Sequence, residues 1–140
     1  MKIQRILSKN LTFPRNYPER EVIVNYKTNE KIICKVPENY SNNAANITFQ
    51  KYCVKHLPNE SSEINFEDLF MRLALEFSED GFEQGYFETK EDAENFKYEI
   101  FYCLEQQIAS PNSPQWFNAG LKRFYGITGE AQGHYYFEKD

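Results

Sequence analysis

The polar residues of the stretch 109–120 are the best candidates for chemistry in this sequence. The stretch reads Ala-Ser-Pro-Asn-Ser-Pro-Gln-Trp-Phe-Asn-Ala-Gly, so two prolines enclose an Asn-Ser pair. A proline fixes its own φ and disfavours helical geometry in the preceding residue, so Ser110 and Ser113 are expected to be non-helical. This predicts a stiff loop whose hydroxyl, amide and backbone N–H donors suit an oxygen-rich ligand such as phosphate. The alternative, which residue chemistry alone favours, is a buried connector whose Asn and Ser side chains bond nearby backbone groups.

Other residue types that often carry catalysis occur without a pattern that indicates a site. Cys34 falls on an expected strand, Cys53 near an expected helix end and Cys103 among the apolar positions of an expected helix, so all three are expected to be small buried side chains and not reactive thiols. His56 and His134 are far apart and isolated from cysteines and paired carboxylates, so no metal site is predicted. The carboxylates are scattered over expected helix ends and faces, and no acid–base pair stands out among them.

The composition indicates an acidic chain with an aromatic core. Of 140 residues, 41% are hydrophobic and 16% aromatic, so much of the core must consist of Phe and Tyr. The net charge of -5 argues against a nucleic-acid polymer or an anionic membrane as partner, but allows a nucleotide held by local donors. No apolar run approaches the roughly 20 residues that span a bilayer. Residues 1–10 lack a signal-peptide core, and the widely spaced cysteines favour a cytoplasmic protein with reduced thiols.

The first part of the chain predicts an irregular arm, a β-hairpin and a helix. Residues 1–20 mix prolines and asparagines with charges, which is typical of a segment without regular structure. Two β-prone runs, 21–26 and 31–36, flank a Thr-Asn-Glu turn and predict the hairpin. A helix is expected to follow, from about residue 39 or 41 to residue 53.

Local start signals then predict two longer helices. An asparagine before an acidic, apolar-periodic run marks the first start, and a Thr-x-x-Asp capping box marks the second. The expected ranges are 65–81 and 89–108, with Ile108 on the buried face of the second helix. A short helical turn at 119–125 and a β-prone run at 134–137 complete the pattern.

Several motifs occur in one order along the chain. They are Val36-Pro37-Glu38-Asn39-Tyr40-Ser41 with Ala44-Ala45-Asn46-Ile47 and Gln50-Lys51-Tyr52, Gly81-Phe82 with Gly85-Tyr86-Phe87, Pro111-Asn112-Ser113-Pro114 with Phe117-Asn118-Ala119-Gly120, and Tyr125-Gly126-Ile127-Thr128-Gly129 with Gln132-Gly133-His134-Tyr135. Together they resemble the N-terminal segment of class II, adenosylcobalamin-dependent ribonucleotide reductases, over about residues 21–136. Tyr40 stands where that family usually has Trp, and Cys53 where it usually has Phe; both are packing changes.

The resemblance implies an α+β, mainly helical fold. An N-terminal β-hairpin and about three helices would precede the Pro-Asn-Ser-Pro loop, which leads towards a downstream α/β barrel. Residues 1–20 would be an arm, and residues 21–140 the class II N-terminal domain without its catalytic barrel. The catalytic cysteines of the family lie beyond Asp140, so no catalytic residue is expected in this chain and the isolated segment is expected to be inactive.

The resemblance also implies a function and a site. The chain would be part of an adenosylcobalamin-dependent ribonucleoside-diphosphate reductase that makes deoxyribonucleotides for DNA synthesis, with the cofactor bound mainly by the missing part. Ser113 would help hold the substrate phosphates, Ser110 and Asn112 are weaker candidates, and Trp116 and Phe117 would pack underneath. The expected partners are a ribonucleoside diphosphate and the downstream barrel. The alternative is a stand-alone, non-catalytic binding or assembly module derived from this domain, and composition does not choose between the two.

Overall fold

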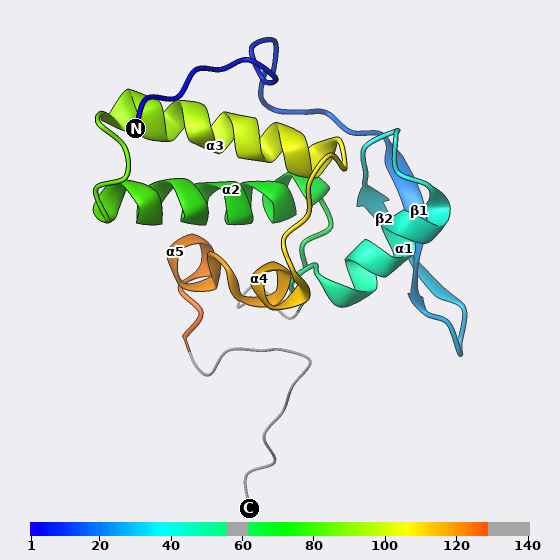
Figure 1. Cartoon of the computed structure of the whole chain (residues 1–140). Helices are drawn as coiled ribbons and strands as arrows, with labels where there is room; N and C mark the ends of the chain where they lie inside the picture. Colours follow the sequence, from blue (N-terminus) through cyan, green and yellow to red (C-terminus); the bar gives the residue numbers. More distant parts are fainter. Residues whose placement is uncertain (56–61, 129–140) are drawn as a thin grey trace, which may run out of the picture.

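The structure, a computed structural model, describes residues 1–55 and 62–128 and has an α+β fold that is mainly helical (Figure 1). In chain order its elements are β1 (Glu19–Asn25), β2 (Glu30–Lys35), α1 (Asn42–Lys51), α2 (Phe66–Glu83), α3 (Lys90–Glu105), α4 (Ser113–Asn118) and α5 (Leu121–Tyr125). The expected hairpin and the three expected helices α1, α2 and α3 are confirmed. Figure 1 shows α2 in the middle, with α3 on one side and the short α4 and α5 on the other. No helix in these two ranges has the length and apolar character that crossing a membrane requires.

The two strands form an antiparallel hairpin whose outer edge is covered by α1. Asn29, with a φ of +57°, makes the reversal between the strands. On the edge of β1 that does not pair with β2, the Ile23 N–H donates to Oδ1 of Asn46 at 2.8 Å, and the Ile23 carbonyl accepts from Nε2 of Gln50 at 2.6 Å. These amides satisfy backbone groups that an unpaired strand edge would leave open. Because β1 begins at Glu19, the last two residues of the expected arm belong to the strand.

Helices α2 and α3 begin at the caps that the sequence predicts. The side chain of Asn65 accepts from the Glu67 N–H at 3.0 Å, and Thr89 and Asp92 form a reciprocal capping box. Helix α2 continues two residues beyond the expected end near Gly81, to Glu83. Gly81 is buried inside it, where a Cβ atom would lie 2.6 Å from the ring of Phe87.

Helix α3 ends at Glu105, three residues before the expected end. Gln107 adopts the left-handed conformation, with a φ of +58°. The Ile108 N–H donates to the Cys103 carbonyl at 2.9 Å and the Gln107 N–H to the Leu104 carbonyl at 3.3 Å, which is the Schellman pattern of a helix end. Ile108 is therefore turned out of the helix and is 59% exposed, so its expected burial is wrong.

The core between the hairpin, α2 and α3 contains many aromatic side chains, as the composition predicts. Phe66, Phe70 and Phe101 are fully buried, and the rings of Phe70 and Phe101 meet edge to face at 5.8 Å between centroids. Tyr40 packs edge to face on Phe66 at 5.8 Å. This core fixes α2, and the candidate site is attached to the opposite side of that helix.

Candidate functional site

The Pro-Asn-Ser-Pro segment contains the start of α4: Asn112 is extended, and Ser113 and Pro114 belong to the first helical turn. Asn112 is the N-cap residue, and its side-chain oxygen accepts from the Gln115 N–H at 3.4 Å, so this side chain braces the start of the helix. Ser113 is the first residue of α4, so its expected non-helical conformation is wrong. The physical reason is that Pro114 lies in the first helical turn, where its missing N–H costs no intrahelical bond and its fixed φ suits the helix.

The two serines of the segment have different partners. The Ser110 hydroxyl accepts from Nε1 of the Trp116 indole at 2.9 Å and is engaged within the loop. The Oγ atom of Ser113, which is half-buried, lies 3.1 Å from the phenolic oxygen of Tyr52. Ser113 is therefore the serine whose hydroxyl meets a side chain from outside the segment.

An aromatic stack supports the loop from below. Trp116 is only 5% exposed, and its ring stacks on that of Tyr52 with centroids 5.2 Å apart and planes 22° apart. Phe117 contacts the same Tyr52 ring at 5.6 Å. The expected packing of these two aromatic residues under the loop is confirmed. Tyr52, at the end of α1, had no place in the predicted site.

The guanidinium of Arg72 joins α4 to α1 through main-chain carbonyls. Arg72 lies in the middle of α2 and is fully buried. Its Nη1 donates to the Ala119 carbonyl at 2.7 Å, and its Nη2 donates to the carbonyls of Trp116 at 3.0 Å and Tyr52 at 3.1 Å. One side chain therefore holds the two segments that carry the Tyr52 and Ser113 hydroxyls, namely the end of α1 and helix α4.

Glu63 balances the buried charge of Arg72. Nε of Arg72 lies 3.2 Å from Oε2 of Glu63, and both side chains are inaccessible to solvent. Glu63 also accepts from the Val54 N–H at 2.7 Å and from the Tyr125 hydroxyl at 2.5 Å. Burial, together with the hydrogen bond to this carboxylate, raises the pKa of Tyr125, so the phenol stays a donor. A buried ion pair is tolerated when its remaining donors and acceptors are satisfied in this way.

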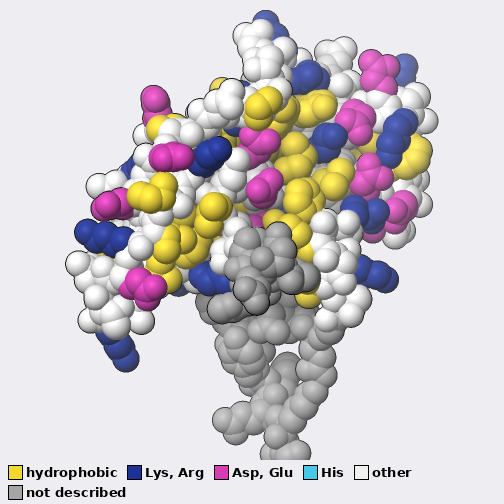
Figure 2. Space-filling model, turned by 180° about the vertical axis from the view of Figure 1, so that it is seen from behind, with side chains coloured by type: hydrophobic (Ala, Val, Ile, Leu, Met, Phe, Trp, Pro, Cys, Tyr) yellow, Lys and Arg dark blue, Asp and Glu magenta, His cyan; other side chains and the backbone are white. Residues whose placement is uncertain are grey.

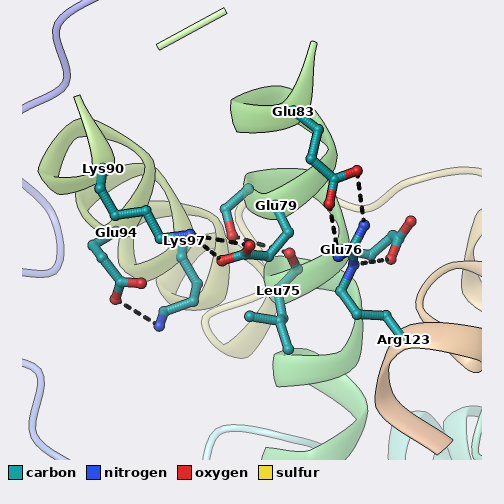
Figure 3. Close-up of polar contacts among 9 residues, drawn as sticks. Leu75, Glu76, Glu79, Glu83, Lys90, Glu94, Lys97 and Arg123 are labelled. Carbon is teal, nitrogen blue, oxygen red and sulfur yellow. Dashed lines mark hydrogen bonds and ion pairs between the residues drawn. The ribbon is translucent and has the colours of Figure 1, made fainter. Parts of the chain in front are cut away.

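A row of acidic side chains on α2 attaches the neighbouring helices at the surface (Figure 3). Arg123 of α5 donates from Nε to Glu76 at 2.9 Å and from Nη1 to Glu83 at 3.0 Å. On the other side of the row, Nζ of Lys90 at the start of α3 lies 2.8 Å from Glu79. Since α5 follows α4 directly, the Arg123 bridge helps to fix the end of the candidate site.

Cys34 and Cys53, which were not expected to be catalytic, are buried. Burial raises the pKa of Cys34 to about 12 and holds that of Cys53 well above its ordinary value, so both thiols stay protonated at neutral pH. Within residues 1–55 and 62–128, no three His, Cys, Asp or Glu side chains are placed to hold a metal ion. His56, His134 and the β-prone run at 134–137 lie outside the described residues.

Sequence comparisons show similarity to vitamin B12-dependent ribonucleotide reductases. The family model for class II vitamin B12-dependent ribonucleotide reductase matches residues 12–107, and the match ends just before the Pro-Asn-Ser-Pro segment. A vitamin B12-dependent ribonucleotide reductase of Bradyrhizobium diazoefficiens is 48% identical over 77 residues, which are 55% of this chain and 6% of the relative. The proteins of the same name from Agrobacterium fabrum and Rhodopirellula baltica are 46% identical over 88 residues and 33% identical over 102 residues. These matches cover 61% and 72% of this chain, but only 7% and 10% of the two relatives.

Proposed function

Because this chain belongs to the class II vitamin B12-dependent ribonucleotide reductase family, we propose that it forms the N-terminal part of an adenosylcobalamin-dependent ribonucleoside-diphosphate reductase. The matches cover at most about a tenth of each curated relative reported above, so the activity is that of a larger protein. The cofactor, when bound by the downstream part, supplies the radical chemistry, and the protein supplies position and shielding. The free cysteines agree with a cytoplasmic enzyme that works with reduced thiols.

The 140-residue chain contributes residues 109–113 to the substrate site. We call this stretch, which ends at the first residue of α4, the Ser113 loop. The single observation that supports this role is the half-buried Ser113 hydroxyl, held on a segment that is anchored at both ends. A hydroxyl fixed before binding can donate to a phosphate oxygen without a large ordering cost. Ser110 and Asn112 are weaker candidates for the same role, because their side chains already brace the loop.

The second contribution is to brace the barrel that would follow in the complete enzyme. Ile108 is 59% exposed where the chain enters the loop, and Ile64 is 48% exposed just before α2. Figure 2 shows hydrophobic side chains in a band across the rear face, with acidic and basic side chains among them. Apolar surface of this kind is suited to burial against a further domain.

The test is a Ser113→Ala variant of a full-length reductase that carries this segment. We expect the KM for a ribonucleoside diphosphate to rise roughly 3- to 10-fold with little change in kcat, since one hydrogen bond to the bound substrate is lost. Ser78→Ala is the matched control, because the Ser78 hydroxyl donates to the Leu75 carbonyl within its own helix α2. The 140-residue segment alone, which we expect to be inactive, is the negative control. An unchanged kcat/KM in Ser113→Ala would show that this serine is structural.

A further inference from the structure

Tyr52 is the residue from outside the loop that reaches the Ser113 hydroxyl. It is held at both ends: its ring stacks on Trp116, and its carbonyl accepts from Arg72 at 3.1 Å. Its hydroxyl, at the far end of the stacked ring, lies 3.1 Å from the Oγ atom of Ser113. The two residues are 61 positions apart in the chain, so only the fold brings their hydroxyls together.

The chemistry of the two hydroxyls favours one direction for this hydrogen bond. Each is both a donor and an acceptor, but a phenol is more acidic than an aliphatic alcohol and is the better donor. When Tyr52 donates to Ser113, a lone pair of the serine oxygen is occupied and the serine proton is free to point away from the phenol. An anion with several acceptor oxygens is the natural partner for that proton.

We propose that Tyr52 is a positioning residue for Ser113, which directs the serine proton towards a phosphate oxygen of the ribonucleotide. This inference rests on the proposed substrate-binding role of Ser113. Tyr52 acts through the serine and does not itself need to touch the substrate. Arg72 sets the distance between the two hydroxyls, since the same guanidinium binds the carbonyls of Tyr52 and Trp116.

The experiment compares Tyr52→Phe, Ser113→Ala and the double variant in a full-length reductase that carries this segment. Phenylalanine keeps the stack on Trp116 and removes only the hydroxyl. We expect Tyr52→Phe to raise the KM for a ribonucleoside diphosphate roughly 2- to 5-fold with kcat unchanged, as loss of one neutral hydrogen bond predicts. The double variant should have the KM of Ser113→Ala alone, because Tyr52 has no effect without the serine hydroxyl.

Tyr40→Phe is the matched control for the loss of a phenolic hydroxyl. The Tyr40 hydroxyl donates to the Leu104 carbonyl at 3.4 Å, away from the loop, so this variant should leave the KM unchanged. The positioning role is wrong if Ser113→Ala raises the KM while Tyr52→Phe does not. It is also wrong if the KM increases of the two single variants multiply in the double variant. In both cases the proposed function stands. An equal rise in KM for Tyr40→Phe would also overturn the positioning role. If Ser113→Ala leaves the KM unchanged, the proposed function itself fails.

Discussion

Gly120 and Arg72 pack backbone against backbone where α4 gives way to α5. A Cβ atom at position 120 would lie 2.4 Å from the carbonyl oxygen of Arg72 and 2.8 Å from its Cγ. Gly120 also has a φ of +78°, in the left-handed region that favours glycine. This approach brings the neighbouring Ala119 carbonyl within 2.7 Å of the Arg72 guanidinium. The absence of a side chain at Gly120 is therefore a condition for the network that holds the Ser113 loop.

Gly120→Ala should destabilise the chain much more than Gly126→Ala. Gly126 has a similar φ of +70°, but among the described residues no atom beyond its chain neighbours lies within 4 Å of the Cβ position there, so only backbone strain is added. That strain costs about 1 to 2 kcal/mol, whereas at Gly120 an additional clash with the main chain of α2 brings the loss to about 3 kcal/mol or more. Denaturant unfolding of the two variants measures the difference. Equal losses would show that the positive φ alone, and not the contact with Arg72, makes glycine necessary.

Removal of one partner of the buried Arg72–Glu63 ion pair should destabilise the fold more than removal of both. Arg72→Met leaves the Glu63 carboxylate buried without its cation, and we expect a loss of about 3 to 5 kcal/mol in the free energy of unfolding. The double variant Glu63→Met/Arg72→Met leaves no unpaired charge, so it should recover part of that loss. Thermal and denaturant unfolding of the single and double variants form the measurement.

Arg123→Met is the control for this pair, because Arg123 also joins two helices through carboxylates but is partly exposed. Exposed ion pairs contribute about 1 kcal/mol or less, so the loss should be correspondingly small. A loss for Arg72→Met no larger than that for Arg123→Met would contradict the central role of Arg72. A double variant less stable than Arg72→Met would show that the ion pair is not the source of the effect.

The elements that the sequence predicts well are those with local signals. The starts of α2 and α3 depend on Asn65 and on the Thr89–Asp92 capping box, which act within one turn of the chain. The end of α3 depends on a left-handed Gln107, a conformation for which the sequence offers no glycine as a signal. The helical start at Ser113 was not predicted, because a residue before proline usually avoids helical geometry. Proline is nevertheless tolerated in the first turn of a helix, and Pro114 lies in that turn.

The candidate site was predictable only in part, because some of its residues are far apart in the sequence. The Ser113 loop is a contiguous motif, but its supports come from distant segments: Tyr52 at the end of α1 and Glu63 just before α2. A hydroxyl–hydroxyl contact across 61 residues leaves no trace in local periodicity. The one available signal was Arg72 itself, a cation between Met71 and Leu73 in an apolar helical run, where a charge must find a buried partner.

Side chains of α3 attach the N-terminal arm, and the Glu99 carboxylate makes the largest group of these hydrogen bonds. Glu99 accepts from the backbone N–H groups of Ile6 at 2.8 Å, Leu7 at 3.1 Å and Ser8 at 3.0 Å, and from the Ser8 hydroxyl at 2.6 Å. Burial opposes the charged form, but these hydrogen bonds together lower the pKa of Glu99 below its ordinary value of 4.5. A second carboxylate, Asp92, accepts from the Ile3 N–H at 3.0 Å, and this bond lowers its pKa from 3.8.

Docking of the arm should therefore weaken at acid pH. A carboxylate whose pKa is lower in the folded state stabilises the fold above its unfolded-state pKa, and this contribution is lost as the pH falls below about 4.5 through the folded-state value. Glu99→Gln should cost about 1 kcal/mol at pH 7 and flatten the pH dependence of unfolding between pH 5 and 3, apart from the share of Asp92. Amide hydrogen exchange at Ile6 and Leu7, followed with pH, measures docking directly. Glu94→Gln, which removes only an ion pair with Lys97, is the control; a wild-type pH dependence in Glu99→Gln would contradict the role of this carboxylate.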